Sequence, residues 1–238
     1  MFAEDEAALL IGAASTADQL ESMVARRVAG EPLEVILGWV EFWGARWAVE
    51  PGVFVPRRRS ELLVREALAA LRPDSVVVEL CAGVAAIAGA IALAAPEARV
   101  YAAELDPVAL PSARLNLAAD HVFKGDLFSA LPLELRGRTD VVVANAPYVP
   151  TAQIALMPPE ARDFEALLAL DGGADGLDVQ RRIVVEAPSW LAPGGTLVIE
   201  TSERQAPLTA ALFEAVGLRT RVSRDDDLDA TAVVGTKL

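Results

Sequence analysis

The sequence predicts an α/β fold in which a mostly parallel sheet of seven strands carries helices on both faces. From residue 56 onward, short apolar runs such as Val76-Val77-Val78 and Val141-Val142-Val143 alternate with segments of helical length. Strands that alternate with helices pair in parallel, because a crossover between parallel strands needs about a dozen residues or more. The chain has 238 residues, 53% of them hydrophobic and 23% charged, which is typical of one globular core with a small appended element.

The first 55 residues lack this alternation. Residues 7–27 have the apolar spacing of a helix, which Gly30-Glu31-Pro32 then interrupts. Residues 35–55 are rich in β-branched and aromatic side chains and are broken by glycine and proline, which predicts a β-hairpin. We therefore expect two parts: an N-terminal helix with a β-hairpin at residues 1–55, and the main domain at residues 56–238.

Within the main domain, each expected strand is a short apolar run between turn residues, and each expected helix is a longer segment. The expected strands are residues 75–80, 99–104, 121–124, 140–145, 195–201, 219–223 and 230–235. The expected helices are residues 60–71, 86–95, 107–117, 178–191 and 205–216. Ligands of such sheets bind at the carboxyl ends of the strands. The candidate site therefore lies in the loops after Leu80, Glu104 and Asn145.

The charge of the chain argues against a nucleic-acid substrate. The formal net charge is −13, whereas proteins that bind phosphates usually carry a basic stripe. The one compact basic run, Arg57-Arg58-Arg59, is typical of a solvated loop. No apolar run approaches the roughly 20 residues of a membrane span, and the acidic start argues against a secretory signal. A single cysteine, Cys81, fits a reducing compartment, so we expect a cytoplasmic protein that does not enter a membrane.

The loop after the first strand of the main domain is a candidate cofactor loop. It follows Glu79, and Gly83 is its one glycine. A nucleotide-type ligand needs backbone N–H groups that approach it closely at this place. Cys81 and Ala85 stand where a G-x-G-x-G pattern has its outer glycines. Taken alone, the loop therefore fits a plain strand-to-helix turn equally well.

Carboxylates on the next two loops favour a cofactor. Glu104 ends its strand, where a carboxylate can accept both ribose hydroxyl protons. Asp126 follows the third strand, where it could accept a hydrogen bond from an adenine amino group while Leu127 or Phe128 packs on the ring. Carboxylates in this order on these loops predict an adenosyl cofactor.

Asn145-Ala146-Pro147-Tyr148, at the end of the strand expected at residues 140–145, is the candidate chemical centre. The side-chain oxygen of Asn145 and the carbonyl of Ala146 could accept the two hydrogens of a planar amide or amine and turn its nitrogen toward a sulfonium methyl group. Pro147 biases Ala146 to an extended conformation, and Tyr148 could stack on the planar group. The alternative is an Asx-type turn closed by Pro147.

Several further motifs occur in a fixed order between about residues 26 and 235. They are Gly30-Glu31-Pro32-Leu33, Ile36-Leu37-Gly38, Phe42-Trp43-Gly44, Pro51-Gly52-Val53-Phe54-Val55-Pro56-Arg57, Glu61-Leu62-Leu63-Val64, Leu170-Asp171-Gly172-Gly173-Ala174-Asp175-Gly176-Leu177-Asp178 and Pro193-Gly194-Gly195. With the candidate centre, they resemble the HemK-type protein-(glutamine-N5) methyltransferases. The resemblance implies a Rossmann-like class I methyltransferase fold and S-adenosyl-L-methionine as cofactor. It also implies a protein substrate that presents a glutamine, with the Gly-Gly-Gln motif of a peptide-chain release factor as the candidate.

The resemblance assigns a role to each candidate residue. The implied catalytic residues are Asn145, Ala146, Pro147 and Tyr148. The implied cofactor residues are Glu79, Cys81, Gly83, Glu104, Asp126, Leu127 and Asn145. The implied substrate residues are Phe42, Phe54, Arg57, Asn145 and Tyr148, and residues 1–55 lie on the substrate side.

Three features depart from the family pattern. Ala146 replaces the first proline of an Asn-Pro-Pro-Tyr motif, and the helical region before the hairpin is short. The cofactor loop has lost two glycines, so we expect Val84 and the methyl group of Ala85 to crowd the cofactor. Two other functions stay open: a nucleic-acid adenine-N6 methyltransferase, whose centre is closely similar, and a non-catalytic binding protein. The one histidine, His121, is expected to be structural, and no His/Cys cluster predicts a metal site.

Overall fold

The computed structural model describes residues 3–238 and contains the seven-stranded sheet that the sequence predicts. Among the described residues the strand order is β5-β4-β3-β6-β7-β9-β8, and β9 alone runs antiparallel to its neighbours. The strands are β3 (Val76–Leu80), β4 (Arg99–Glu104), β5 (Val122–Lys124), β6 (Thr139–Ala144), β7 (Leu191–Glu200), β8 (Leu218–Asp225) and β9 (Ala230–Lys237). The chain order reverses between β3 and β6, which places a ligand crevice at their carboxyl ends.

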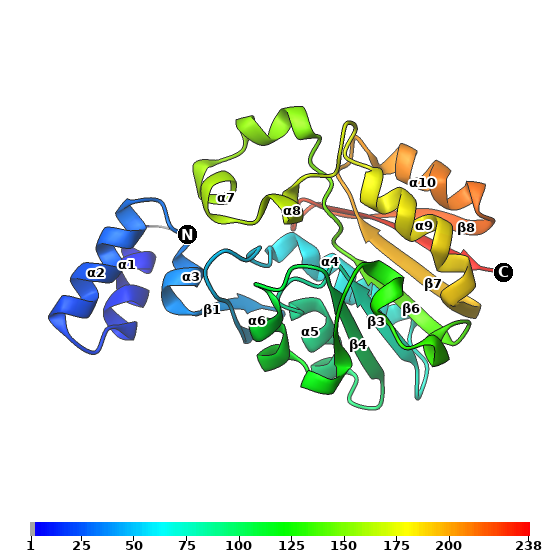
Figure 1. The fold of residues 1–238 in the computed structure, drawn as a ribbon, viewed down its shortest axis with the longest axis horizontal. Helices are drawn as coiled ribbons and strands as arrows, with labels where there is room; N and C mark the ends of the chain where they lie inside the picture. Colours follow the sequence, from blue (N-terminus) through cyan, green and yellow to red (C-terminus); the bar gives the residue numbers. More distant parts are fainter. Residues whose placement is uncertain (1–2) are drawn as a thin grey trace.

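Helices cover both faces of this sheet, as predicted (Figure 1). One face carries α4 (Glu61–Ala70), α5 (Ala86–Ala94) and α6 (Leu110–Asn116), and the other carries α9 (Asp178–Trp190) and α10 (Ala206–Ala215). Val77 and Val141 pack on the first face, and their neighbours Val78 and Val142 pack on the second. All four are fully buried, because strands covered on both sides are apolar at consecutive positions. Within residues 3–238 we find no helix with the length and apolarity of a membrane span.

The β-hairpin is shorter than the expected residues 35–55. Its strands are β1 (Trp39–Phe42) and β2 (Ala45–Ala48), and residues 49–57 form turns and extended chain outside any strand. Trp47 lies over Gly89 of α5, where an added Cβ would be 2.3 Å from Cζ3 of the indole. Asn116 accepts a hydrogen bond from the N–H of Ala48 at 2.8 Å and donates to its carbonyl at 2.9 Å. The hairpin therefore belongs to the same apolar core as α4 and α5.

Two helices stand where the sequence predicts one at residues 7–27. They are α1 (Ala3–Ala13) and α2 (Ala17–Val28), and the hydroxyl of Thr16 caps α2 by accepting from the N–H of Gln19 at 3.1 Å. A third helix, α3 (Leu33–Leu37), occupies part of the expected hairpin. Leu10, Met23, Leu33 and Ile36 give these helices an apolar cluster of their own. They project from the main body on the side opposite the C-terminus (Figure 1). The division at residues 55 and 56 stays a prediction.

Three short helices between β6 and α9 were not among the expected elements. They are η5 (Thr151–Leu156), α7 (Pro159–Phe164) and α8 (Leu167–Leu170). Glu165, between α7 and α8, accepts hydrogen bonds from the guanidinium of Arg57 and from the N–H of Val55, the latter at 3.3 Å. Glu160 of α7 pairs with Arg27 of α2 at 3.2 Å. This segment therefore connects the N-terminal helices with the chain that follows the hairpin.

Candidate active site

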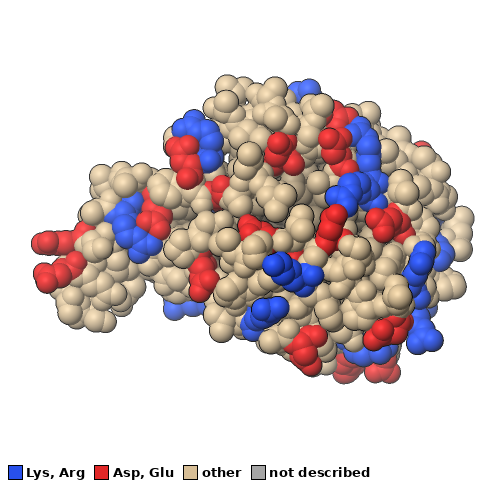
Figure 2. All heavy atoms as spheres, viewed as in Figure 1, with Lys and Arg blue, Asp and Glu red and all other residues tan. Residues whose placement is uncertain are grey.

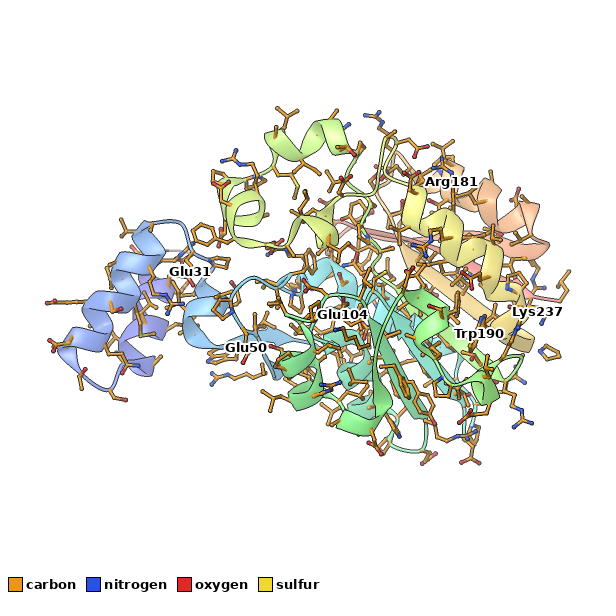
Figure 3. All side chains as sticks on the ribbon, viewed as in Figure 1. Glu31, Glu50, Glu104, Arg181, Trp190 and Lys237 are labelled. Atoms are coloured by element: carbon orange, nitrogen blue, oxygen red, sulfur yellow. The ribbon has the colours of Figure 1, made fainter. Side chains whose placement is uncertain are left out.

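A cavity opens at the carboxyl ends of β3, β4 and β6. It brings together every residue predicted for the cofactor and for the chemical centre, namely Glu79, Cys81, Gly83, Glu104, Asp126, Leu127, Asn145, Ala146, Pro147 and Tyr148. Phe54 and Arg57 line it as well. Figure 3 labels Glu104 near the centre of the molecule, far from Glu31 in the N-terminal part and from Lys237 in β9. The roles of these residues toward a ligand stay predictions.

The loop between β3 and α5 has the backbone shape of a glycine loop, although it holds one glycine. The φ angle is 53° at Cys81, 55° at Gly83 and 57° at Ala85. For a residue with a side chain, this left-handed conformation is less favourable by roughly 1–2 kcal/mol. Hydrogen bonds hold the shape, because the N–H of Ala85 donates to the carbonyl of Ala82 at 2.7 Å and the N–H of Ala82 donates to the carbonyl of Ala103 at 3.2 Å.

The two residues expected to crowd the cofactor differ in position. Val84 lines the cavity, whereas Ala85 does not. Ala85 is fully buried in the apolar cluster that includes α5. The expected crowding by its methyl group is therefore wrong, because that group lies in the core.

Two buried glutamates hold the candidate cofactor loop and the helix that follows it. The Oε2 and Oε1 atoms of Glu104 accept from the backbone N–H groups of Gly83 and Asp106, each at 2.6 Å. Glu79 accepts from the N–H of Ala88 in the first turn of α5 at 2.8 Å. Burial raises the pKa of Glu104, and it raises the pKa of Glu79 well above its usual value. When it is ionised, Glu104 can present hydrogen-bond acceptors to ribose hydroxyls, while Glu79 fixes the start of α5.

The loop after β5 separates the residues expected around an adenine. The Oδ2 atom of Asp126 pairs with the guanidinium of Arg182 at 2.6 Å, and Leu127 lies beside it in the cavity wall. Phe128 does not line the cavity, because its ring stacks on Trp190 in the core with 5.3 Å between centroids. Of the two candidates for packing on an adenine ring, Leu127 therefore remains.

Asn145 presents one side of its amide to the protein. Its Nδ2 donates to Oγ of Ser60 at 3.1 Å, and no residue within 3–238 donates a hydrogen bond to its Oδ1. The Asx-type turn is wrong, because this side chain bonds to Ser60 and Pro147 has no N–H to offer. The hydroxyl of Tyr148 donates to Oε1 of Glu200 at 3.4 Å. Burial and the nearby Glu200 raise the pKa of Tyr148 to about 12.

The motif at residues 170–178 packs against the centre and holds its backbone. The N–H of Val149 donates to the carbonyl of Leu170 at 3.1 Å, and Val149 accepts from the N–H of Gly172 at 2.9 Å. Nε2 of Gln205 donates to the carbonyl of Tyr148 at 2.9 Å. Gly176 has a φ of 81°, and a Cβ added there would lie 2.2 Å from that carbonyl oxygen. Glycine at this position therefore lets the two loops touch.

Of the three predicted substrate residues outside the chemical centre, Phe54 and Arg57 line the cavity. The guanidinium of Arg57 lies 5.2 Å from the ring centroid of Phe54 and pairs with Glu165. Phe42 does not line the cavity. It is 1% exposed within the core, and its carbonyl accepts from Nε1 of Trp47 at 2.8 Å. The apolar ring of Phe42 is thus part of the hairpin packing, and its assignment to the substrate residues is corrected.

Comparison with known proteins decides the family. No family model matches the chain. A release factor glutamine methyltransferase of Geobacter sulfurreducens is 38% identical over 220 residues, which cover 91% of this chain and 76% of that protein. The chain belongs to the release factor glutamine methyltransferase family. The member from Streptomyces coelicolor is 43% identical over 197 residues, 80% of this chain and 70% of that one.

Membership confirms the resemblance drawn from the motifs and makes the chain a methyltransferase. A relative with another acceptor in its name is the 4-amino-L-phenylalanine/4-methylamino-L-phenylalanine methyltransferase of Streptomyces pristinaespiralis. It is 38% identical over 203 residues, which cover 82% of this chain and 71% of that enzyme. This glutamine methyltransferase family member thus also resembles an enzyme that methylates a small aromatic amine.

Solved structures show the fold. A methyltransferase from Pyrococcus furiosus matches with a TM-score of 0.61 at 16% identity, over 91% of this chain and 97% of that one. The E. cuniculi Mtq2-Trm112 complex, which methylates the eRF1 termination factor, matches with a TM-score of 0.55 at 22% identity, over 78% of this chain and 98% of that one. At these identities the similarity extends to the class I methyltransferase fold alone.

Several residues of the candidate site were not predicted from the sequence. Ser60, Arg182 and Glu165 line the cavity, and Glu200 contacts Tyr148. Glu200 ends β7, so the rule that pointed to Glu104 at the end of β4 would also have pointed to it. Ser60, Glu165 and Arg182 do not stand at strand ends, so that rule does not point to them.

His121 lies outside the cavity, as expected for a structural residue. Its Nδ1 is 2.9 Å from the carbonyl oxygen of Val100, and its ring packs against Tyr101 at 4.6 Å between centroids. Residues 3–238 contain no group of three or more metal-ligating side chains.

Proposed function

We propose that this methyltransferase transfers the methyl group of S-adenosylmethionine to the side-chain amide nitrogen of a glutamine in a protein, and that the protein is a peptide-chain release factor. The relatives named for that activity support the acceptor class. The observation that carries the proposal is that Oδ1 of Asn145 accepts no hydrogen bond from residues 3–238 and that its side chain lines the same cavity as Glu104. We place the reaction in the cytoplasm, since a chain with one cysteine fits a reducing compartment.

An amide nitrogen is a weak nucleophile, because its lone pair is delocalised into the carbonyl group. Oδ1 of Asn145 and the carbonyl of Ala146 each accept one of its hydrogens, which holds the nitrogen in line for attack. Tyr148 packs on the planar amide. The cofactor supplies an electrophilic methyl group on a sulfonium. Glu104 would accept hydrogen bonds from its ribose hydroxyls. Transfer would break the bond between the sulfonium sulfur and the methyl carbon as the N–C bond forms, leaving the sulfur as a neutral thioether, and the methylated nitrogen would release its surplus proton to solvent.

The cofactor side of the cavity fits an adenosyl group. Glu104 offers carboxylate oxygens, and Gly83 offers open backbone, since a Cβ added there would meet no atom within 4 Å. Leu127 gives an apolar contact for the adenine, and Asp126 gives an acceptor for its amino group. S-adenosylmethionine is the methyl donor that these groups would hold.

A small aromatic amine is the second candidate acceptor, favoured by the similarity to the enzyme of Streptomyces pristinaespiralis. A nucleic-acid base is disfavoured. The net charge is −13, and on the face drawn in Figure 2 the basic side chains within residues 3–238 are interspersed with acidic ones. Such a surface lacks the continuous basic stripe that phosphate backbones require.

The test supplies methyl-labelled S-adenosylmethionine with three separate acceptors: an unmodified release factor, total nucleic acid and 4-amino-L-phenylalanine. We expect label on the release factor alone, and no label on a matched release factor whose Gly-Gly-Gln glutamine is replaced by alanine. Label confined to nucleic acid or to the amino acid would overturn the proposed acceptor. Calorimetry with the cofactor comes first, because absence of binding at millimolar concentration would contradict the activity itself.

A further inference from the structure

The buried carboxylate of Glu200 gathers three groups behind the chemical centre. Glu200 is 2% exposed and ends β7. Its Oε2 accepts from the hydroxyl of Ser60 at 2.6 Å. Its Oε1 lies 3.1 Å from Nε of Arg59 and 3.4 Å from the hydroxyl of Tyr148. Arg59 forms an ion pair with this carboxylate, and both of its oxygens accept hydrogen bonds.

This carboxylate determines the direction of the next hydrogen bond. A serine hydroxyl has one proton, and a carboxylate can only accept, so the proton of Ser60 points to Glu200. Toward Asn145 the oxygen of Ser60 can then only accept. Asn145 must therefore turn its NH₂ group to Ser60, which is the observed contact at 3.1 Å.

The opposite atom of that amide becomes the one offered to a substrate. Nδ2 is held by Ser60, so Oδ1 is the amide atom of Asn145 that has no partner in the described part of the chain, and the side chain lines the cavity. An oxygen at this place accepts from the NH₂ of a glutamine and repels the carboxylate of a glutamate. A flipped amide would have the reverse preference, since NH₂ donates only.

We propose that Ser60 and Glu200 are positioning residues that lock the amide of Asn145 with its oxygen toward the substrate, and so make the site select an amide over a carboxylate. The inference rests on the proposed function for the nature of the substrate. Glu200 also holds the hydroxyl of Tyr148, and the guanidinium of Arg59 lies 6.0 Å from the centroid of the Tyr148 ring. One carboxylate thus orients the side chains at both ends of Asn145-Ala146-Pro147-Tyr148.

Glu200→Gln is the sharpest variant, because it keeps the shape of the side chain and reverses the relay. Arg59 requires an oxygen on its side, so the introduced NH₂ faces Ser60. Ser60 would accept from it and donate to Asn145, which turns the Asn145 NH₂ toward the cavity. Ser60→Ala removes the relay, and Ser60→Thr keeps the hydroxyl. Glu203→Gln removes one carboxylate from an exposed residue of the following loop and serves as the matched control.

The experiment measures kcat and KM on a glutamine-containing release factor, and inhibition by the same protein with glutamate in place of that glutamine. For Glu200→Gln we expect kcat/KM to fall about 10- to 100-fold and the glutamate protein to inhibit about 10-fold more strongly, the range that one reversed hydrogen bond to a charged or polar group spans. Ser60→Ala should lower kcat/KM about 10-fold, and Ser60→Thr should recover most of that loss. Glu203→Gln should match the wild type. Calorimetry with S-adenosylmethionine checks that each variant is folded.

Unchanged rates and an unchanged glutamine-to-glutamate preference in Ser60→Ala and Glu200→Gln would overturn the inference. A lower rate with the preference unchanged would do the same, since a merely structural role produces that result. If Glu200→Gln fails to bind cofactor, the Ser60→Ala and Ser60→Thr pair decides the question on the same two readouts. A wild-type protein that leaves the glutamine unmethylated would instead refute the proposed function, which keeps the two failures distinct.

Discussion

The Oε2 atom of Glu104 lies 2.6 Å from the backbone nitrogen of Gly83, so the carboxylate at the end of β4 holds the loop that follows β3. Its other oxygen accepts from the N–H of Asp106 at the same distance. Glu104 therefore joins two cavity loops before any ligand binds. Its ionisation state determines both the loop contact and the acceptors available to a ribose.

The affinity for the cofactor should depend on pH through Glu104. Burial raises the pKa of this carboxyl above the usual 4.5, and the ionised form is the one that accepts from ribose hydroxyls. Affinity should therefore be full at high pH and decline as the pH falls through the raised pKa, earlier than for an ordinary glutamate. Calorimetry with S-adenosylhomocysteine between pH 5 and 8 measures this. Glu104→Gln should bind roughly 10-fold or more weakly and lose this component of the pH dependence; a wild-type affinity independent of pH would contradict the assignment.

Gly83→Ala should separate stability from cofactor binding. Its φ of 55° imposes strain of roughly 1–2 kcal/mol on an alanine, and no atom lies within 4 Å of the added Cβ. Denaturation should show a decrease in the free energy of unfolding no larger than this strain. Calorimetry should show weaker cofactor binding, because Gly83 lines the cavity. Gly137→Ala is the matched control, with a φ of 74° and open space around the Cβ, and should leave binding unchanged. Equal binding by both variants would remove Gly83 from the cofactor site.

Gly176→Ala should destabilise the protein by forcing apart the two loops that meet at the backbone of Tyr148. The added Cβ would lie 2.2 Å from the carbonyl oxygen of Tyr148 and 2.4 Å from Nε2 of Gln205, so the two loops must separate. We expect the free energy of unfolding to drop by roughly 3 kcal/mol or more, from strain and overpacking together. Gly217→Ala has the same φ of 81° with no atom near the Cβ, and should lose roughly 1–2 kcal/mol by strain alone. Similar losses in the two variants would show that the loops do not depend on this contact.

Asn145→Ala should abolish methyl transfer and leave cofactor binding nearly intact. The side chain bonds to Ser60 and offers Oδ1 to the acceptor, while the cofactor loop is held separately by Glu104. Label transfer and calorimetry on the same preparation measure the two properties. Parallel loss of both would identify Asn145 as a structural residue.

The predictable parts of the fold are those that short-range patterns determine. Val76-Val77-Val78 in β3 and Val141-Val142-Val143 in β6 are continuous apolar runs, the pattern of strands that are buried on both faces. The predicted hairpin is too long. Val53 and Val55 are β-branched and so favour a strand, yet they pack in the core as irregular chain. The segment from η5 to α8 has helices of six residues or fewer, whose formation depends on contacts such as that of Glu165 with Arg57.

The site divides in the same way. Glu104 and Asn145 stand at strand ends, where topology alone makes them candidates. Ser60 meets Glu200 across 140 positions of sequence, and no local pattern encodes that distance. The prediction that Phe42 contacts the substrate is wrong, because an aromatic residue near a hairpin turn is equally suited to a core and to a binding surface. Burial decides between these roles, and burial depends on the whole fold.

The three left-handed residues at alternate positions of the cofactor loop bear on how such proteins are recognised. Cys81 and Ala85 adopt a positive φ angle, which is usually found at glycine, and here contacts with the surrounding strands and helix impose it. A sequence search that requires glycine at all three positions would miss this loop, whereas a structural search for three positive φ angles at alternate residues would find it. In chains like this one, the residues of the loop can change while contacts with the neighbouring strand and helix maintain its backbone geometry.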